Sequence, residues 1–232
     1  MKKLLQSLNW FEWLMTAGVT IASIFAIYQG VGQAWLSSFA AITGIICVIL
    51  CAKGKRSSYI WGFVNVIAYA VLAFRWTYYG EVALNALYFM PTQFIGWFYW
   101  SKHLNVDVNE VKAKVMGLKE IIIWGAATLV TMFVVYQILG MIGAGFYAVN
   151  QDGVNMAGSM SLTLSLVANI LMVKRYAEQW PLWIIVNIAS IYLWVSAGDI
   201  VQTTMWSMYL INAIYGWYLW VRMKKTRNIE NE

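Results

Sequence analysis

Tryptophan and asparagine side chains occur twice in this chain at a spacing suited to binding a small organic molecule. Trp61 and Asn65 are four residues apart, and so are Trp183 and Asn187. Residues four apart share one face of a helix, so each pair would present an indole and an amide one turn apart. Indole faces suit flat rings, including delocalised cations, and amides both donate and accept hydrogen bonds. The two pairs therefore indicate a site for a ring-containing solute.

Further polar side chains lie inside apolar stretches. An amide facing lipid would leave its donors and acceptors unpaired, so these groups must face other helices or a cavity. Hydrogen bonding between helices is the alternative for any one of them, at about 0.6 kcal/mol a pair. The amides in question are Asn65, Asn85, Gln93, Asn169, Asn187 and Asn212, with Thr43, Ser161, Thr163 and Ser165 nearby, and Tyr88 and Tyr209 shortly before Gln93 and Asn212.

Tryptophan also forms belts at the membrane surface, which is a second interpretation of these residues. For Trp61 and Trp183 this alternative stays open, because each lies at the start of an apolar segment. Asn65 and Asn187 lie one turn deeper and are the stronger candidates. A belt is the expected role of Trp10, Trp13, Trp97, Trp100, Trp217 and Trp220.

Ionisable side chains are expected only at segment ends, where Glu12, Glu81, Glu120, Asp199 and Arg75 lie. Proton-coupled carriers and pumps normally place such a group at depth, and ion channels use charged rings or exposed carbonyls. We therefore expect an uncharged path, a passive carrier, and a site that holds a delocalised cation without a counter-ion. Sodium coupling through backbone carbonyls stays open.

Metal and cofactor sites are not expected. Cys47 and Cys51 are four apart, but no histidine or carboxylate accompanies them, so we interpret them as packing residues. His103, the single histidine, has no partner for metal binding or proton transfer.

The composition is that of a membrane protein: of 232 residues, 61% are hydrophobic and 11% are charged, against about 25% charged in soluble domains. Apolar segments long enough to cross a bilayer occur at about 10–29, 34–52, 59–75, 82–101, 120–142, 158–173, 181–197 and 203–221. The sixth and seventh are short. Only residues 102–119 could form a small structure outside lipid.

The basic residues predict the orientation. With eight crossings and a cytoplasmic N-terminus, fifteen of the sixteen Lys and Arg residues fall in cytoplasmic segments, and only Arg75 falls outside. Both termini are then cytoplasmic. The net charge of +6 is thereby explained by orientation and contact with anionic lipid, and nucleic acid is not an expected partner. In a seven-helix alternative, the first segment lies flat on the membrane. This segment lacks a signal-peptide cleavage site, so we expect it to be retained in the protein.

The chain also repeats itself. In the first half of the chain, the pair Trp61 and Asn65 is followed by Gly96 and Trp97. The second Trp–Asn pair is likewise followed by Gly216 and Trp217, so the same motifs recur in the same order about 120 residues later. The fold class we predict is an all-α polytopic membrane protein with two parallel three-helix repeats joined by a linker helix. Its parts are an extra N-terminal helix (1–33), the first repeat (34–101), a cytoplasmic loop and linker helix (102–157), the second repeat (158–221) and a cytoplasmic tail (222–232).

Three runs resemble the PnuC family of bacterial vitamin transporters: residues 85–93 (NALYFMPTQ) with Gly96 and Trp97, residues 164–172 (LSLVANILM) and residues 174–187 (KRYAEQWPLWIIVN). The resemblance covers about 38–220. It implies a SWEET-like 3+1+3 core in the bacterial inner membrane and a homotrimer. It also implies facilitated diffusion of nicotinamide riboside, with net uptake through phosphorylation by a cytoplasmic kinase. Substrate contacts by this resemblance would come from Trp61, Asn65, Tyr88, Gln93, Asn169, Trp183, Asn187 and Asn212.

Other functions stay open. Relatives with the same architecture carry thiamine or a flavin, so a thiamine transporter is the nearest alternative. A membrane-embedded enzyme or receptor subunit is the alternative from another class. Enzymes need positioned acids, bases, metals or nucleophiles, and the sequence offers no such group at depth, so we expect no enzyme.

Overall fold

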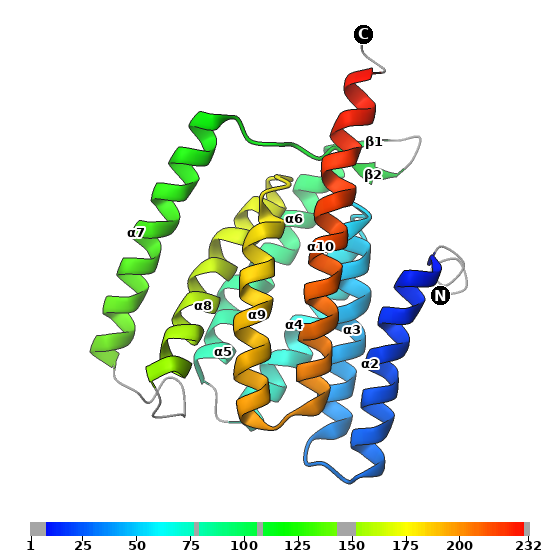
Figure 1. Ribbon diagram of the computed structural model, residues 1–232, viewed down its shortest axis with the longest axis vertical. Helices are drawn as coiled ribbons and strands as arrows, with labels where there is room; N and C mark the ends of the chain where they lie inside the picture. Colours follow the sequence, from blue (N-terminus) through cyan, green and yellow to red (C-terminus); the bar gives the residue numbers. More distant parts are fainter. Residues whose placement is uncertain (1–7, 77–78, 106–108, 143–151, 230–232) are drawn as a thin grey trace.

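The structure of the chain is a computed structural model that describes residues 8–76, 79–105, 109–142 and 152–229. Long helices lie side by side and alternate in direction (Figure 1). They are α2 (Trp10–Tyr28), α3 (Ala34–Ala52), α4 (Ser58–Arg75), α5 (Tyr79–Leu84), the π-helical turn η1 (Asn85–Phe89), α6 (Met90–Ser101), α7 (Leu118–Ile142), α8 (Asp152–Val173), α9 (Gln179–Ala197) and α10 (Ile200–Ile229), with short strands β1 (Leu104–Asn105) and β2 (Glu110–Val111).

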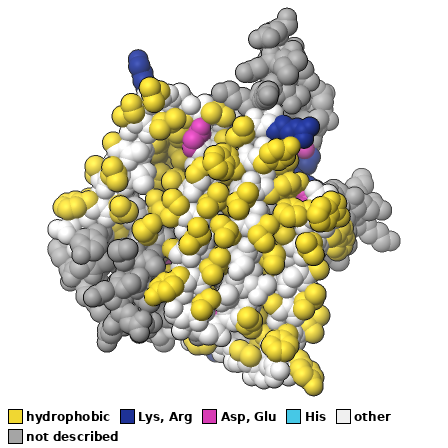
Figure 2. Space-filling view, viewed as in Figure 1, with side chains coloured by type: hydrophobic (Ala, Val, Ile, Leu, Met, Phe, Trp, Pro, Cys, Tyr) yellow, Lys and Arg dark blue, Asp and Glu magenta, His cyan; other side chains and the backbone are white. Residues whose placement is uncertain are grey.

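All eight predicted apolar segments are helical. Within the described residues, five helices are individually long and apolar enough to cross a membrane: α2, α3, α4, α7 and α9. None of the stretch Leu118–Val135 in α7 is buried, and α7 lies at one side of the bundle beside α8 (Figure 1). Hydrophobic side chains cover the face seen in Figure 2, and the visible Lys and Arg side chains lie near its upper end. The chain is a membrane protein.

Two helices differ from the predicted segments. The fourth segment is not one α-helix, because η1 interrupts it, and the Met90 N–H donates to the Asn85 carbonyl five residues back. Pro91 follows directly; its ring clashes with the carbonyl four residues earlier in a regular α-helix, and a wider π turn relieves that clash. The last helix continues through Ile229, past the predicted end at 221. Its final turns carry several Lys and Arg residues, which are favoured at a helix C-terminus.

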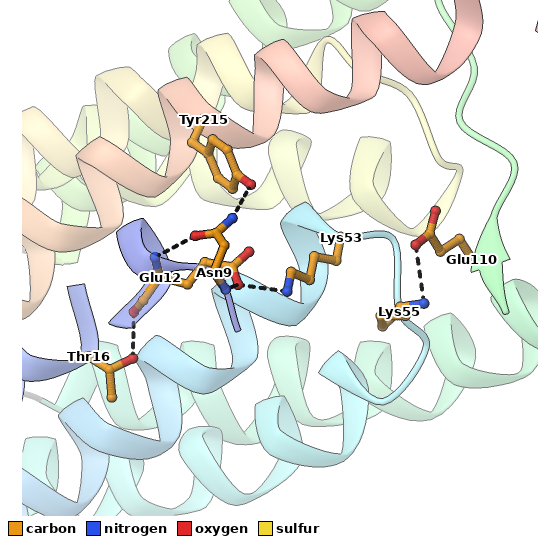
Figure 3. A network of polar contacts seen from close by, with 7 residues as sticks. All are labelled: Asn9, Glu12, Thr16, Lys53, Lys55, Glu110 and Tyr215. Atoms are coloured by element: carbon orange, nitrogen blue, oxygen red, sulfur yellow. Dashed lines mark hydrogen bonds and ion pairs between the residues drawn. The ribbon is translucent and has the colours of Figure 1, made fainter. Parts of the chain in front are cut away.

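The first helix is anchored along the bundle and does not lie flat. Asn9 accepts from the Glu12 N–H, and the Glu12 carboxylate accepts from the Asn9 N–H, both at 2.9 Å. Glu12 is fully buried and forms an ion pair of 2.6 Å with Lys53 at the end of α3, while the Asn9 amide donates to the Tyr215 hydroxyl on α10 (Figure 3). A buried carboxylate needs such a partner. Glu12 lies in the first turn of α2, at a segment end as predicted, and the structure adds that its side chain is buried inside the bundle.

Two tryptophans connect neighbouring helices close to where α3, α6 and α8 end. The Trp100 Nε1–H on α6 donates to the Met172 carbonyl on α8 at 3.1 Å, and the Trp220 Nε1–H on α10 donates to the Ala52 carbonyl of α3 at 3.1 Å. Both side chains are fully buried. The belt prediction is wrong for these two, because their rings fill the interior, whereas Trp10 is 78% exposed.

The repeated glycines allow aromatic rings to approach the helix backbone. A Cβ on Gly96 would collide with the ring of Tyr59, and one on Gly216 would lie 2.6 Å from Trp180 Cζ2. Glycine in the repeated Gly-Trp motif is therefore required by packing.

Residues 109–117, here called the crossing segment, connect two interhelical turns at the upper end. The Val111 N–H donates to the Gly54 carbonyl in the α3–α4 turn, and the Lys114 N–H donates to the Arg175 carbonyl in the α8–α9 turn, both at 2.8 Å. Gly54 and Arg175 both have left-handed backbones, with φ of +64° and +68°. The crossing segment thereby ties both halves of the bundle together.

Candidate functional site

A cavity of about 240 Å³ lies inside the bundle. It is enclosed by α3, α4 and the α5–η1–α6 segment on one side and by α8, α9 and α10 on the other. The polar and aromatic lining consists of amides (Asn65, Asn85, Gln93, Asn169, Asn187, Asn212), hydroxyls (Ser161, Ser165, Ser190, Ser196), thiols (Cys47, Cys51), rings (Tyr69, Phe89, Trp180, Trp183, Trp194, Trp206, Tyr209) and one carboxyl group (Glu81).

The structure brings six of the eight predicted site residues together around this cavity: Asn65, Gln93, Asn169, Trp183, Asn187 and Asn212. Trp61 and Tyr88 are not among the lining residues. The Tyr88 hydroxyl donates to the Leu166 carbonyl and so links the fourth segment to α8, and Trp61 is half-buried. Substrate contact by any of the eight stays a prediction.

Several amides use their NH₂ group in helix packing and keep oxygens for another partner. The Asn212 amide donates to the Val48 carbonyl at 3.0 Å, and the Asn169 amide donates to the Thr92 hydroxyl at 3.0 Å. The Oδ1 atoms of Asn169 and Asn212 are buried and accept no hydrogen bond from the described residues. Buried acceptors without a donor are costly, so a ligand with hydroxyl or NH₂ groups would stabilise this site. Packing and ligand binding are thus compatible roles for one amide.

Asn65 and Asn187 differ in this respect. The Asn65 amide donates to the Ala40 carbonyl of α3 at 2.7 Å. Asn187 is 3% exposed, lines the cavity and forms no side-chain hydrogen bond within the described parts of the chain. Both polar atoms of Asn187 are therefore available to a ligand.

Aromatic rings occupy much of the lining, and most of them were missed in the sequence. Trp180 and Trp194 are seven residues before and after Asn187, and Trp183 and Ser190 are between them, so α9 presents one continuous stripe to the cavity. Tyr69 is four residues after Asn65 on α4. Extending each Trp–Asn pair by further helical turns would have identified these rings. The Tyr69 and Trp194 centroids are 6.3 Å apart at 83°.

Glu81 is the unexpected member of the lining. It is the third residue of α5, four residues before Asn85, and its side chain is half-buried. No Lys, Arg or His is among the described residues that line the cavity. The prediction of an uncharged path is therefore wrong: the cavity reaches the start of the fourth segment, so a residue at a segment end still lines it.

Metal-binding groups do not gather here. Within the described residues there is no group of three or more His, Cys, Asp and Glu side chains that could hold a metal ion. Cys47 and Cys51 are free thiols that line the cavity. The chemistry on offer is hydrogen bonding, ring stacking and one carboxylate.

Comparison with known proteins assigns the chain to a family. Residues 34–222 match the family described as "Nicotinamide mononucleotide transporter". A nicotinamide riboside transporter PnuC of Neisseria mucosa is 37% identical over 203 residues, which cover 83% of this chain and 74% of the relative. The protein of the same name from Haemophilus influenzae is 35% identical over 223 residues, 94% of this chain and 92% of the relative.

A solved structure shows the same fold. It is described as a crystal structure of the vitamin B3 transporter PnuC, and it superposes with a TM-score of 0.80 at 33% identity over 97% of each chain. The match includes the helices that enclose the cavity. With a family match over most of its length and relatives above 30% identity, the chain belongs to the PnuC family of membrane transporters.

Proposed function

We propose that this protein carries nicotinamide riboside across the bacterial inner membrane by facilitated diffusion. Phosphorylation of the riboside by a cytoplasmic kinase would trap it inside the cell and so produce net uptake. The relatives named for this vitamin support the substrate class. The cavity supports it chemically, because amide oxygens can accept hydrogen bonds from ribose hydroxyls and from a carboxamide, and tryptophan faces can stack on a pyridinium ring. In this proposal the contacts come from the six predicted residues that line the cavity, foremost Trp183, Asn187 and Asn212.

The observation that carries the proposal is the charge of the lining. A phosphate monoester bears a charge of about −1.5 to −2 at pH 7 and needs Arg, Lys or helix N-termini. The described lining offers Glu81 and no basic side chain. A phosphorylated nucleotide would be desolvated without a partner and would face a carboxylate. The cavity therefore favours the riboside over the mononucleotide of the family's description.

We also propose the 3+1+3 arrangement, with α3, α4 and α5–η1–α6 as the first triplet, α7 as linker, and α8, α9 and α10 as the second triplet. Matched contacts support it. Trp100 in the first triplet donates a hydrogen bond to the Met172 carbonyl in the second, and Trp220 in the second triplet donates one to the Cys51 carbonyl in the first. The two donors are 120 positions apart in the sequence, and the two acceptors are 121 positions apart. Thr92 and Asn169 pair across the same interface, as do Asn212 and Val48. Two parallel triplets facing each other would place the substrate between them.

The proposed orientation has the upper end of Figure 1 in the cytoplasm. The turns 53–57 and 174–178, the crossing segment and the end of α10 lie there, and these parts hold most of the basic residues. Lys2 and Lys3 belong to the same expectation but lie outside the described residues.

Uptake into proteoliposomes tests the function. Purified protein should let labelled nicotinamide riboside equilibrate across the membrane, and nicotinamide mononucleotide and thiamine should not compete at equal concentration. A kinase and ATP enclosed in the vesicles should turn equilibration into accumulation. An uncoupler or the absence of sodium should leave the initial rate unchanged.

Several results would reject the proposal. Folded protein that moves no riboside would exclude this substrate, and stronger competition by thiamine would favour the thiamine alternative. Riboside converted to another compound by the protein alone would indicate an enzyme. A rate that collapses with the proton gradient would replace facilitated diffusion by coupling, for which Glu81 would be the titrating group.

A further inference from the structure

The position of Glu81 raises a question about the charge of the ligand. α5 lies toward the lower part of the bundle (Figure 1), and Glu81 projects from its first turn into the lining. Within the described residues the Glu81 carboxyl has no ion-pair partner within 4.0 Å and no side-chain hydrogen bond. By contrast Glu12, also buried in the bundle, is paired with Lys53. A half-buried carboxylate without a partner is costly in a water-poor environment, so a positive ligand would stabilise it.

Aromatic rings line the same cavity as this carboxyl group. The ring of Tyr69 on α4 meets that of Trp194 from the second triplet. Glu81, Tyr69 and Trp194 all line the same cavity. Ring faces attract a delocalised cation, and a carboxylate supplies its counter-charge. Together they have the chemistry of a subsite for a flat organic cation.

The charge is present in one triplet only. The position 120 residues after Glu81 is Val201, which is 1% exposed, and the position 120 residues after Asn85 is Met205. The described lining therefore contains one carboxyl group and no basic side chain. An ionised carboxylate would match a ligand with one positive charge.

We propose that Glu81 is the residue by which this carrier selects the positive charge of its ligand. The inference rests on the proposed function, because nicotinamide riboside carries that charge on its pyridinium ring. Its neutral counterpart is reduced nicotinamide riboside, in which the ring is a dihydropyridine while the sugar and the carboxamide are the same. Glu81 distinguishes the two ligands, and the amides do not.

Binding of these two ligands to the purified full chain in nanodiscs, measured by calorimetry, tests the inference. The wild type should bind the oxidised form at least about tenfold more tightly than the reduced form. Glu81→Gln keeps the size and removes the charge, so it should lose about tenfold or more in affinity for the oxidised form and keep its affinity for the reduced form. Glu81→Asp should retain part of the preference.

Glu110→Gln is the matched control, because it removes one negative charge at the β2 strand, where Glu110 pairs with Lys55 outside the cavity. It should leave both affinities unchanged. A melting temperature for each variant shows whether it is folded. The preference of the wild type for the oxidised form is a second measurement that needs no variant.

The outcomes separate the inference from the proposed function. Riboside binding with equal affinity for both forms in the wild type, or an unchanged preference in Glu81→Gln, overturns the inference and leaves the function standing. An equal loss of both ligands in folded Glu81→Gln also overturns it, because the residue would then be structural. A wild type that binds neither form overturns the proposed function and the inference with it.

Discussion

The two triplets agree where they hold each other and differ where they face the cavity. At the upper end, Trp100 and Trp220 make equivalent hydrogen bonds across the interface, and Gly96 and Gly216 admit equivalent rings. At the cavity, the first triplet supplies Glu81, Asn85 and Gln93, and the positions 120 residues later are Val201, Met205 and Ala213. The second triplet supplies three indoles from α9: Trp180, Trp183 and Trp194.

This difference has a simple physical meaning. Contacts that close the bundle benefit from being identical, because both triplets pack on each other in the same way. A small ligand between them is not symmetric, so each triplet can specialise. Each triplet provides three amides, whereas the first alone provides the carboxyl group and the second provides most of the rings. We infer that the requirements of packing kept the repeated motif the same in both triplets, whereas the requirements of ligand binding made the cavity-lining residues at equivalent positions different.

The largest expected effect tests the packing equivalence. Gly96→Ala and Gly216→Ala should each destabilise the protein by about 1–3 kcal/mol, because the added Cβ overlaps Tyr59 in one case and Trp180 in the other. Thermal unfolding in detergent measures this. Gly216→Ala should also weaken riboside binding, because Trp180 lines the cavity, whereas Tyr59 is not among its lining residues.

Gly125→Ala is the control for these variants. Gly125 is in α7, and a Cβ there meets no atom within 4 Å, so alanine should leave the melting temperature unchanged or raise it slightly. Destabilisation by only one of the two triplet variants would break the equivalence of the two interfaces.

A second effect of similar size tests the specialisation at equivalent amides. Asn187→Ala should weaken riboside binding by about 1–3 kcal/mol with little change in melting temperature, because Asn187 has no side-chain partner within the described residues. Asn65→Ala should lower the melting temperature as well, because it removes the hydrogen bond that the Asn65 amide donates to the Ala40 carbonyl of α3. Calorimetry and thermal unfolding of both variants separate these roles. Equal losses of stability in the two variants would contradict them.

Most of the fold could be predicted from sequence, because it follows from hydrophobicity. The predicted boundaries of α3 are exact, and those of α4 and α9 differ by one or two residues. The π turn at Asn85–Phe89 could not be predicted, since several local geometries can accommodate Pro91. The burial of Trp100 and Trp220 was also missed, because an end-of-helix tryptophan is compatible with both a lipid belt and a packed interface.

The cavity was predicted in part. The Trp–Asn spacing correctly indicated Trp183 and Asn187 as cavity-lining, since both lie on one stripe of α9. It failed for Trp61, the equivalent of Trp183, because the two triplets do not turn equivalent indoles to the cavity. Glu81 was discounted because hydropathy places it at a segment end, and only the three-dimensional path of the cavity shows that this end contributes to the lining.

The smallest expected effect concerns the turns that hold the crossing segment and the neighbouring start of α7. Lys55 in the α3–α4 turn pairs with Glu110 at 3.2 Å, and Tyr176, 121 positions later in the α8–α9 turn, donates to Glu120. Lys55→Met and Tyr176→Phe should each lower the melting temperature slightly, since exposed ion pairs are worth below about 1 kcal/mol. Lys102→Met removes an exposed charge and is the control.

Salt and pH distinguish the two turns. The effect of Lys55→Met should shrink in 1 M salt, where the screening length is about 3 Å, while that of Tyr176→Phe should persist.

The hydrogen bond to Glu120 raises the pKa of Tyr176 from 10.0 to about 12. The stabilising contribution of the neutral hydroxyl is therefore full below pH 10, declines as the unfolded chain ionises first, and is lost above pH 12. The difference in melting temperature between wild type and Tyr176→Phe should narrow from pH 9 to pH 11, and a constant difference would mean that the ring and not the hydroxyl holds this turn.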